Sequence, residues 1–99
     1  MRTSEPGRIA VENVNHPGST RPVDAARYGA MRHAILSALP ALGPGLTIAE
    51  LSAIVRPQLP ADLFPGALAG WWLKTVQLDL EAKRLIARTT TSPIRLHRT

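Results

Sequence analysis

Apolar residues recur at helical spacing in three segments of the chain, and the first segment follows a helix-capping residue. Asp24 is a residue type that favours the N-cap position, and Pro40 blocks continuation at the other end. We therefore predict a helix from Asp24 to about Leu39. Its apolar positions lie three or four residues apart, which places them on one face. They are Tyr28, Met31, Ile35 and Leu39.

The second segment begins with a capping box. Thr47 and Glu50 have the spacing at which a hydroxyl and a carboxylate each accept a bond from a backbone N–H at the start of a helix. The helix is expected to end at Arg56, before Pro57, and a proline-rich connector with one helical turn over Ala61–Phe64 follows it. The predicted buried face consists of Leu51, Ile54 and Val55.

The third segment, from about Ala67 to Lys83, is predicted to be a helix with two apolar stripes. Successive side chains lie about 100° apart around a helix. One stripe is predicted to face the core and consists of Trp72, Leu73, Val76 and Leu80. The opposite stripe consists of Trp71, Leu78 and Ala82. Polar side chains separate the stripes, with Lys74, Gln77 and Glu81 on one flank and Thr75 and Asp79 on the other.

The second stripe needs a cover, because a buried tryptophan stabilises a fold by a few kcal/mol. The N-terminal arm is the first candidate, through Ile9, Val11 or Val14. A second copy of the same helix in a homodimer is another candidate. The third alternative is an exposed tryptophan without a role, since scattered apolar surface is normal. Asp79 and Glu81 are expected to lie on a solvated face and to pair with Lys74, Lys83 or Arg84 at helical spacing.

Strand patterns flank the helical segments. Residues 1–22 are predicted to form an arm with a short strand and a turn at Pro17-Gly18, and residues 23–99 to form the domain. Residues 85–90 and 93–98 are predicted to be two short strands with Thr91-Ser92 near the turn. Ile86 alternates with Arg88 in the first strand, and Ile94 with Leu96 in the second. We expect one apolar and one basic face.

Net charge is concentrated at the end of the chain. Residues 1–82 carry seven basic and seven acidic side chains, whereas residues 83–99 carry five basic side chains and no acid, so the whole formal charge of +5 lies there. A basic hairpin of this kind can contact phosphates. The alternative is a solvated basic terminus that aids solubility.

Composition excludes several classes of site. The chain has no cysteine, which removes disulfides, thiol nucleophiles and cysteine-based zinc sites and fits a cytoplasmic location. The first residues lack the apolar segment of a secretory signal, and the longest apolar run near the tryptophans is far shorter than the ~20 residues that span a bilayer. His16, His33 and His97 form no metal-binding pattern, and no catalytic triad or phosphate loop is present. We therefore expect no enzyme activity, metal, cofactor, small-molecule ligand or membrane contact.

The order of arm, three helices and basic hairpin resembles a winged helix-turn-helix domain. The segment LEAKRLIAR, Leu80 to Arg88, is similar to the junction between the recognition helix and the first wing strand, although Arg84 stands where many such domains carry glycine. The longer pattern NHPG, ALPALGPGLTIAEL, LFPG, GWWLKTVQLDLEAK and PIRLHR resembles a family of small bacterial proteins without an assigned function. The resemblance implies a mainly α fold with a small β-hairpin and a possible extra N-terminal strand, and it implies no activity.

Two hypotheses of function follow. The resemblance implies that the outward side of the third helix enters the major groove of double-stranded DNA while the hairpin grips phosphates. The expected contacts are Lys74, Thr75, Gln77, Lys83, Arg84, Arg88, Arg95 and Arg98. The rival hypothesis is a protein-interaction or homodimerisation module that keeps the same fold without binding DNA. Its expected interface residues are Trp71 and Leu78.

Overall fold

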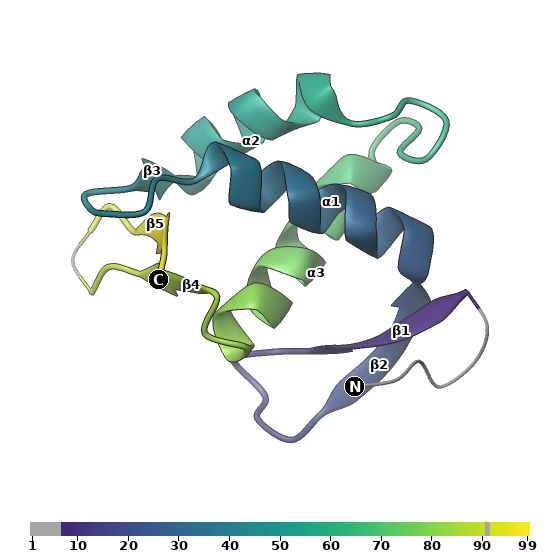
Figure 1. Cartoon of the computed structure of the whole chain (residues 1–99), viewed down its shortest axis with the longest axis horizontal. Coiled ribbons are helices and arrows are strands. Elements are labelled where there is room, and N and C mark those ends of the chain that lie inside the picture. Colours follow the sequence, from purple (N-terminus) through teal and green to yellow (C-terminus); the bar gives the residue numbers. More distant parts are fainter. Residues whose placement is uncertain (1–6, 91) are drawn as a thin grey trace.

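The chain folds into a small α+β domain with three helices and two small antiparallel sheets (Figure 1). The computed structural model describes residues 7–90 and 92–99, so residues 1–6 of the predicted arm and Thr91 of the predicted turn lie outside the described part. The elements are β1 (Arg8–Glu12), β2 (Thr20–Asp24), α1 (Ala25–Ala38), β3 (Leu46–Thr47), α2 (Ile48–Val55), a 3-10 turn (Arg56–Gln58), α3 (Leu68–Ala82), β4 (Ile86–Arg88) and β5 (Arg95–Arg98).

The first two helices begin as their capping residues predict. The Asp24 carboxylate accepts from the backbone N–H of Arg27 at 2.9 Å and caps α1. The capping box of α2 is complete, with Glu50 N–H donating to the Thr47 hydroxyl at 3.1 Å and Thr47 N–H donating to the Glu50 carboxylate at 2.9 Å. The bond from the Thr47 backbone is the main cause that holds the pKa of Glu50 below its ordinary value.

The helical stripes pack together into one core. The predicted stripe of α1 is buried throughout, and so are Leu51 and Val55 of α2. Ile54 is 39% exposed, so its predicted burial is wrong, because α2 directs only Leu51 and Val55 inward. The predicted turn over Ala61–Phe64 is present as a single turn, with Phe64 N–H donating to the Pro60 carbonyl at 3.2 Å. Phe64 packs edge-on against Trp72 with the ring centroids 6.2 Å apart.

Helix α3 lies within one residue of its predicted bounds and buries the predicted core stripe. Its end has a left-handed residue, Arg84, with φ of 61°. The backbone N–H of Leu85 donates to the Leu80 carbonyl and that of Arg84 to the Glu81 carbonyl, each at 3.0 Å. These two bonds form a Schellman motif. Arg84 therefore occupies the position where glycine is the common residue.

The N-terminal arm is a β-hairpin that packs against α3 (Figure 1). Strands β1 and β2 pair with Ile9 opposite Val23 and Val11 opposite Arg21. The predicted boundary after residue 22 falls inside β2, whose last residue caps α1. Val11 and Val23 join the core, and the predicted short strand is thus confirmed.

The second apolar stripe of α3 divides into a covered half and an exposed half. The backbone N–H of Glu12 in β1 donates to Asp79 at 2.8 Å, which fixes the arm beside the C-terminal half of α3. Leu78, in that half, is 7% exposed, whereas Trp71, near the N-terminus of the helix, is 44% exposed. The arm reaches Trp71 only through Arg21, whose guanidinium carbon lies 5.4 Å from the ring centroid.

The second sheet has the strand order β3-β5-β4 and joins the predicted hairpin to the loop before α2. Leu46 pairs with Leu96, and Arg88 also lies opposite Leu96 on the other edge of β5. The expectation of one apolar and one basic face is wrong, because residues two apart on a strand share a face and directly opposed residues share it too. Arg88 therefore lies on the same face as the buried Ile86 and Leu96. Ile94 precedes β5 and is 44% exposed.

Candidate functional site

The hairpin arginines expected to grip DNA are engaged within the chain. Arg88 donates to both oxygens of Glu81, from Nε at 2.5 Å and from Nη2 at 2.9 Å. This bidentate contact raises the pKa of Arg88 above its ordinary value. Arg95 donates to Glu50 at 3.2 Å. Much of the hairpin charge is therefore balanced by carboxylates of α2 and α3.

Asp79 and Glu81 do not form the solvated face that we expected. They are 0% and 8% exposed, because the arm and the hairpin cover the two flanks of α3 on which they lie. Asp79 accepts from the Tyr28 hydroxyl at 2.5 Å, from the Glu12 backbone and from the Lys83 ammonium. Lys83 also lies 3.4 Å from the Glu12 carboxylate. The predicted pairing of Asp79 with Lys83 is thus present.

Gln77 is buried rather than outward-facing, with 2% of its surface exposed. Its amide nitrogen donates to Glu81 at 2.9 Å, and within the described residues its amide oxygen has no hydrogen-bond partner. Because the amide nitrogen is already bonded to Glu81, Gln77 cannot offer both amide groups to an adenine edge, so the predicted base contact by Gln77 does not fit the geometry.

Three cations surround the exposed N-terminal half of α3, and we call this surface the α3 patch. It consists of Arg21 from β2, which lies over the Trp71 ring, Arg56 after α2, which lies near Gly70, and the exposed Lys74 of α3. Arg56 donates to the Ser52 hydroxyl at 2.8 Å, and a Cβ atom added to Gly70 would lie 3.2 Å from its Nη2 atom. Among residues 7–90 and 92–99, no ion pair joins these three cations to a carboxylate. Of the predicted contacts, only Lys74 and the half-buried Thr75 beside it belong to this surface.

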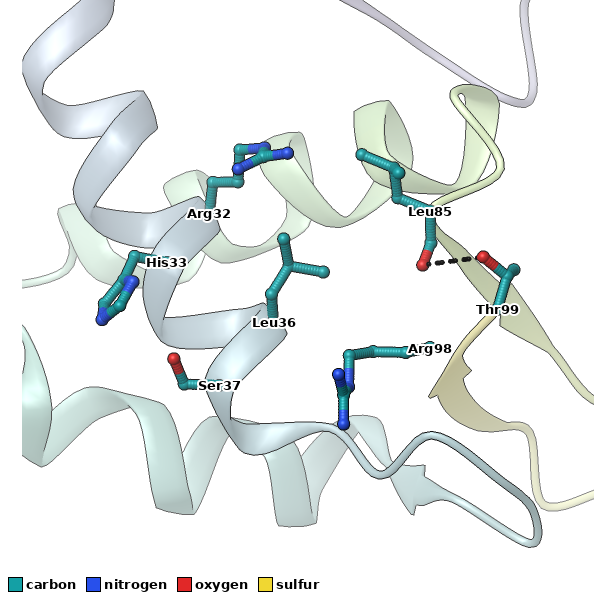
Figure 2. A pocket seen from close by; sticks show the side chains of 7 residues that line it. All are labelled: Arg32, His33, Leu36, Ser37, Leu85, Arg98 and Thr99. Atoms are coloured by element: carbon teal, nitrogen blue, oxygen red, sulfur yellow. Dashed lines mark hydrogen bonds between the residues drawn. The ribbon is translucent and has the colours of Figure 1, made fainter.

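Arg98 and Arg84 lie elsewhere, at the C-terminal end of the fold. Arg98 borders a groove of about 500 Å³ that we call the C-terminal groove (Figure 2). It is lined by Arg32, His33, Leu36, Ser37, Leu85, Arg98 and Thr99. The Nε of Arg98 donates to the Leu39 carbonyl at 2.9 Å. Arg84 is exposed, and its backbone carbonyl accepts from Thr99 Oγ1 at 2.8 Å. Among the described residues, positive charge without an ion-pair partner therefore lies both on the α3 patch and in this region.

A second groove of about 500 Å³ runs between α2 and α3, next to the α3 patch. The α2 side supplies Ile48, Ala49, Ser52 and Arg56, and the α3 side supplies Gly70, Leu73, Lys74 and Gln77. We call it the interhelical groove. This groove, Arg21 and Arg56 were not predictable from the sequence, because their residues come from separate segments and no local pattern joins them.

Residues 7–90 and 92–99 contain no group of three or more histidine, cysteine or acidic side chains placed to hold a metal ion. In the same residues, no helix combines the length and apolar character needed to cross a bilayer.

Comparisons with known proteins identify a family. No curated protein and no solved structure matches the chain. The model of a family of unknown function, DUF6958, matches residues 8–96, which include every described helix and both sheets apart from the last residues of β5. The chain therefore belongs to the family of unknown function DUF6958.

Proposed function

We propose that this domain is a small nucleic-acid-binding module with a winged-helix-like arrangement, and that it contacts duplex DNA through the α3 patch. The observation that carries the proposal is the position of three cations around the exposed half of α3 that have no carboxylate partner within the described residues. Phosphate contacts from such cations release counterions and supply most of the affinity of nonspecific binding.

The order of elements supports this use of α3. In helix-turn-helix proteins the recognition helix presents its N-terminal residues to the base edges. Here the arm covers the C-terminal half of α3 at Asp79, while Trp71 and Lys74 in the N-terminal half stay exposed. The hairpin that follows α3 is tied to β3, which precedes α2, so it has a fixed place beside the helices.

The proposed phosphate contacts differ from those expected from the sequence alone. Arg88 and Arg95 already bond to Glu81 and Glu50, so their transfer to phosphates would leave those carboxylates without partners. Lys74 remains a contact, and Arg21 and Arg56 replace the hairpin arginines. Trp71, on the same half of α3, lies under the Arg21 guanidinium and is partly exposed.

Replacing Arg21, Arg56 and Lys74 together with glutamine is expected to weaken binding to a random duplex by about tenfold or more at low salt. The slope of log K against log salt should fall by about 3, one unit for each lost phosphate contact. Fluorescence anisotropy with a labelled duplex at several salt concentrations measures both quantities.

The matched control removes the same charge elsewhere, by replacing Arg32, Arg84 and Arg98 with glutamine. This variant should keep most of the affinity and a salt slope close to that of the wild type. Equal losses in both triple variants would show that net charge alone drives binding. Wild-type protein that fails to bind at low salt would exclude the proposed function.

A second candidate function, self-association, is favoured by exposed apolar side chains on the same helix. Leu68 and Trp71 are three residues apart on one side of α3 and are 45% and 44% exposed. A second copy of this helix would cover both side chains. The ring of Trp71 packs edge-on against that of Trp72, with the centroids 5.2 Å apart, and lies under the Arg21 guanidinium. These two contacts fix the orientation of the Trp71 side chain before a partner binds.

If that candidate holds, the wild type dimerises and Trp71→Ala weakens the dimer by about 30-fold, the usual loss at a central interface tryptophan. Sedimentation equilibrium over a range of concentrations measures the dissociation constant. Glutamine at the partly exposed Thr75 is a control on the same helix. A wild type that remains monomeric at every concentration excludes the homodimer.

A further inference from the structure

One residue that lines the interhelical groove carries a buried acceptor that has no donor within the described residues. Gln77 lines this groove, is 2% exposed, and its Oε1 has no hydrogen-bond partner among the described residues. Buried polar atoms in proteins are nearly always paired, so an unpaired one calls for a specific explanation. Within residues 7–90 and 92–99, no other buried side-chain nitrogen or oxygen is in this state.

The orientation of the Gln77 amide is fixed by its neighbours. A carboxylate only accepts hydrogen bonds, so the amide nitrogen must face Glu81, to which it donates at 2.9 Å. Glu81 itself accepts from Nε and Nη2 of Arg88. Turning the amide over would set two acceptors against each other. The oxygen therefore stays on the side away from Glu81.

The rest of the groove has an apolar wall and a cationic edge. Ile48, Ala49 and Leu73 supply the apolar contacts. Arg56 and Lys74 supply the charge, and Arg56 is held in place by Ser52 at 2.8 Å and by its close approach to Gly70. Apolar walls with a few convergent polar groups are typical of sites that bind small ligands or peptide ends.

We propose that the interhelical groove binds the carboxyl terminus of a peptide that ends in an apolar residue. The terminal carboxylate pairs with Lys74 and Arg56, the N–H of the last residue donates to Gln77 Oε1, and its side chain packs on Ile48, Ala49 and Leu73. Each polar group of the groove thereby meets a complementary group. Inorganic phosphate lacks the apolar part, and a free amino acid brings an ammonium group that Lys74 and Arg56 repel.

N-acetyl-leucine is the probe, since it carries the carboxylate, the neutral N–H and the apolar side chain of such a terminus. In a titration followed by NMR, the backbone amide signals of Ser52, Gly70 and Gln77 should shift. N-acetyl-leucinamide, which lacks the carboxylate, and N-acetyl-N-methylleucine, which lacks the N–H, should each bind about tenfold more weakly, as expected for the loss of one charge-assisted or buried hydrogen bond. Free leucine should also bind more weakly than N-acetyl-leucine.

Variants test the same contacts from the protein side. Gln77→Met and Lys74→Gln should each weaken binding of N-acetyl-leucine about tenfold. Arg84→Gln, which removes one charge outside the groove, should leave it unchanged. Gln77→Met should also leave duplex affinity unchanged, because Gln77 is not exposed in the α3 patch. Peptide binding, which this inference proposes, can therefore fail while DNA binding holds. DNA binding can likewise fail while N-acetyl-leucine still binds the groove.

Three results would overturn the proposal. The first is a titration in which N-acetyl-leucine shifts none of the three amide signals. The second is equal affinity for N-acetyl-leucine and its amide. The third is equal affinity for the N–H and N-methyl probes, which tests the bond to Gln77 even if Gln77→Met fails to fold.

Discussion

Replacing Asp79 with asparagine is expected to lower the free energy of unfolding by about 3 kcal/mol. The Asp79 side chain is 0% exposed and accepts from Tyr28, from the Glu12 backbone and from Lys83. Asparagine has nearly the same shape but offers one oxygen and one donor group. One of the buried donors would then face another donor, and Lys83 would lose its charge partner. Urea unfolding followed by circular dichroism measures the loss.

Tyr28→Phe is the matched control for the Asp79 network. It removes one donor and leaves the carboxylate with its other two partners, so the expected loss is about 1 kcal/mol. Burial, followed by the bond to Asp79, raises the pKa of Tyr28 well above its ordinary value, and the hydroxyl remains a donor at physiological pH. If Asp79→Asn costs no more than Tyr28→Phe, the carboxylate does not hold the arm against α3 as described.

The helices were predictable because their signals are local. Asp24 caps α1 through a bond to a residue three positions along, and the Thr47–Glu50 box closes over the same distance. The core stripe of α3 also follows from spacing alone, since Trp72, Val76 and Leu80 repeat every four residues on one face. These features need no knowledge of what the rest of the chain does.

The polar face of α3 was not predictable in the same way. Spacing gives the direction of Asp79 and Glu81 around the helix, but not what covers them. The arm reaches Asp79 from 67 positions away in the sequence, through Glu12, and the hairpin reaches Glu81 through Arg88 beyond the end of the helix. Two acidic residues that look solvated in the sequence therefore anchor the two sheets to α3.

Of the cations in the α3 patch, only the one on α3 itself was predictable from the sequence. Lys74 follows from its position on α3. Arg21 and Arg56 come from β2 and from the turn after α2, and only the folded chain brings them beside Trp71 and Gly70. The basic sequence of the hairpin predicted free arginines there. This prediction did not account for Glu50 and Glu81, their ion-pair partners, because these lie in other elements.

Replacing Gly45 with alanine is expected to lower the free energy of unfolding by about 4 kcal/mol. Losses of this size are seen when a substitution violates a specific requirement of the backbone or the core. Gly45 has φ of +87°, which residues with a Cβ atom rarely adopt. A Cβ atom there would also lie 2.3 Å from the carbonyl oxygen and 2.8 Å from the carbonyl carbon of Leu96. These are backbone atoms of β5, so no side-chain rotation relieves the contact.

Gly43→Ala is the control for Gly45→Ala, since it lies in the same loop, has no left-handed φ and would place its Cβ atom with nothing within 4 Å. Its expected effect is within about 0.5 kcal/mol of zero. The strain of Gly45→Ala arises next to the pair Leu46 and Leu96. This variant should therefore speed amide hydrogen exchange more in β5 than in α1. Equal stability of the two variants would mean that β3 does not approach β5 this closely. In that case the hairpin would not be fixed beside α2 and α3 through β3 as described.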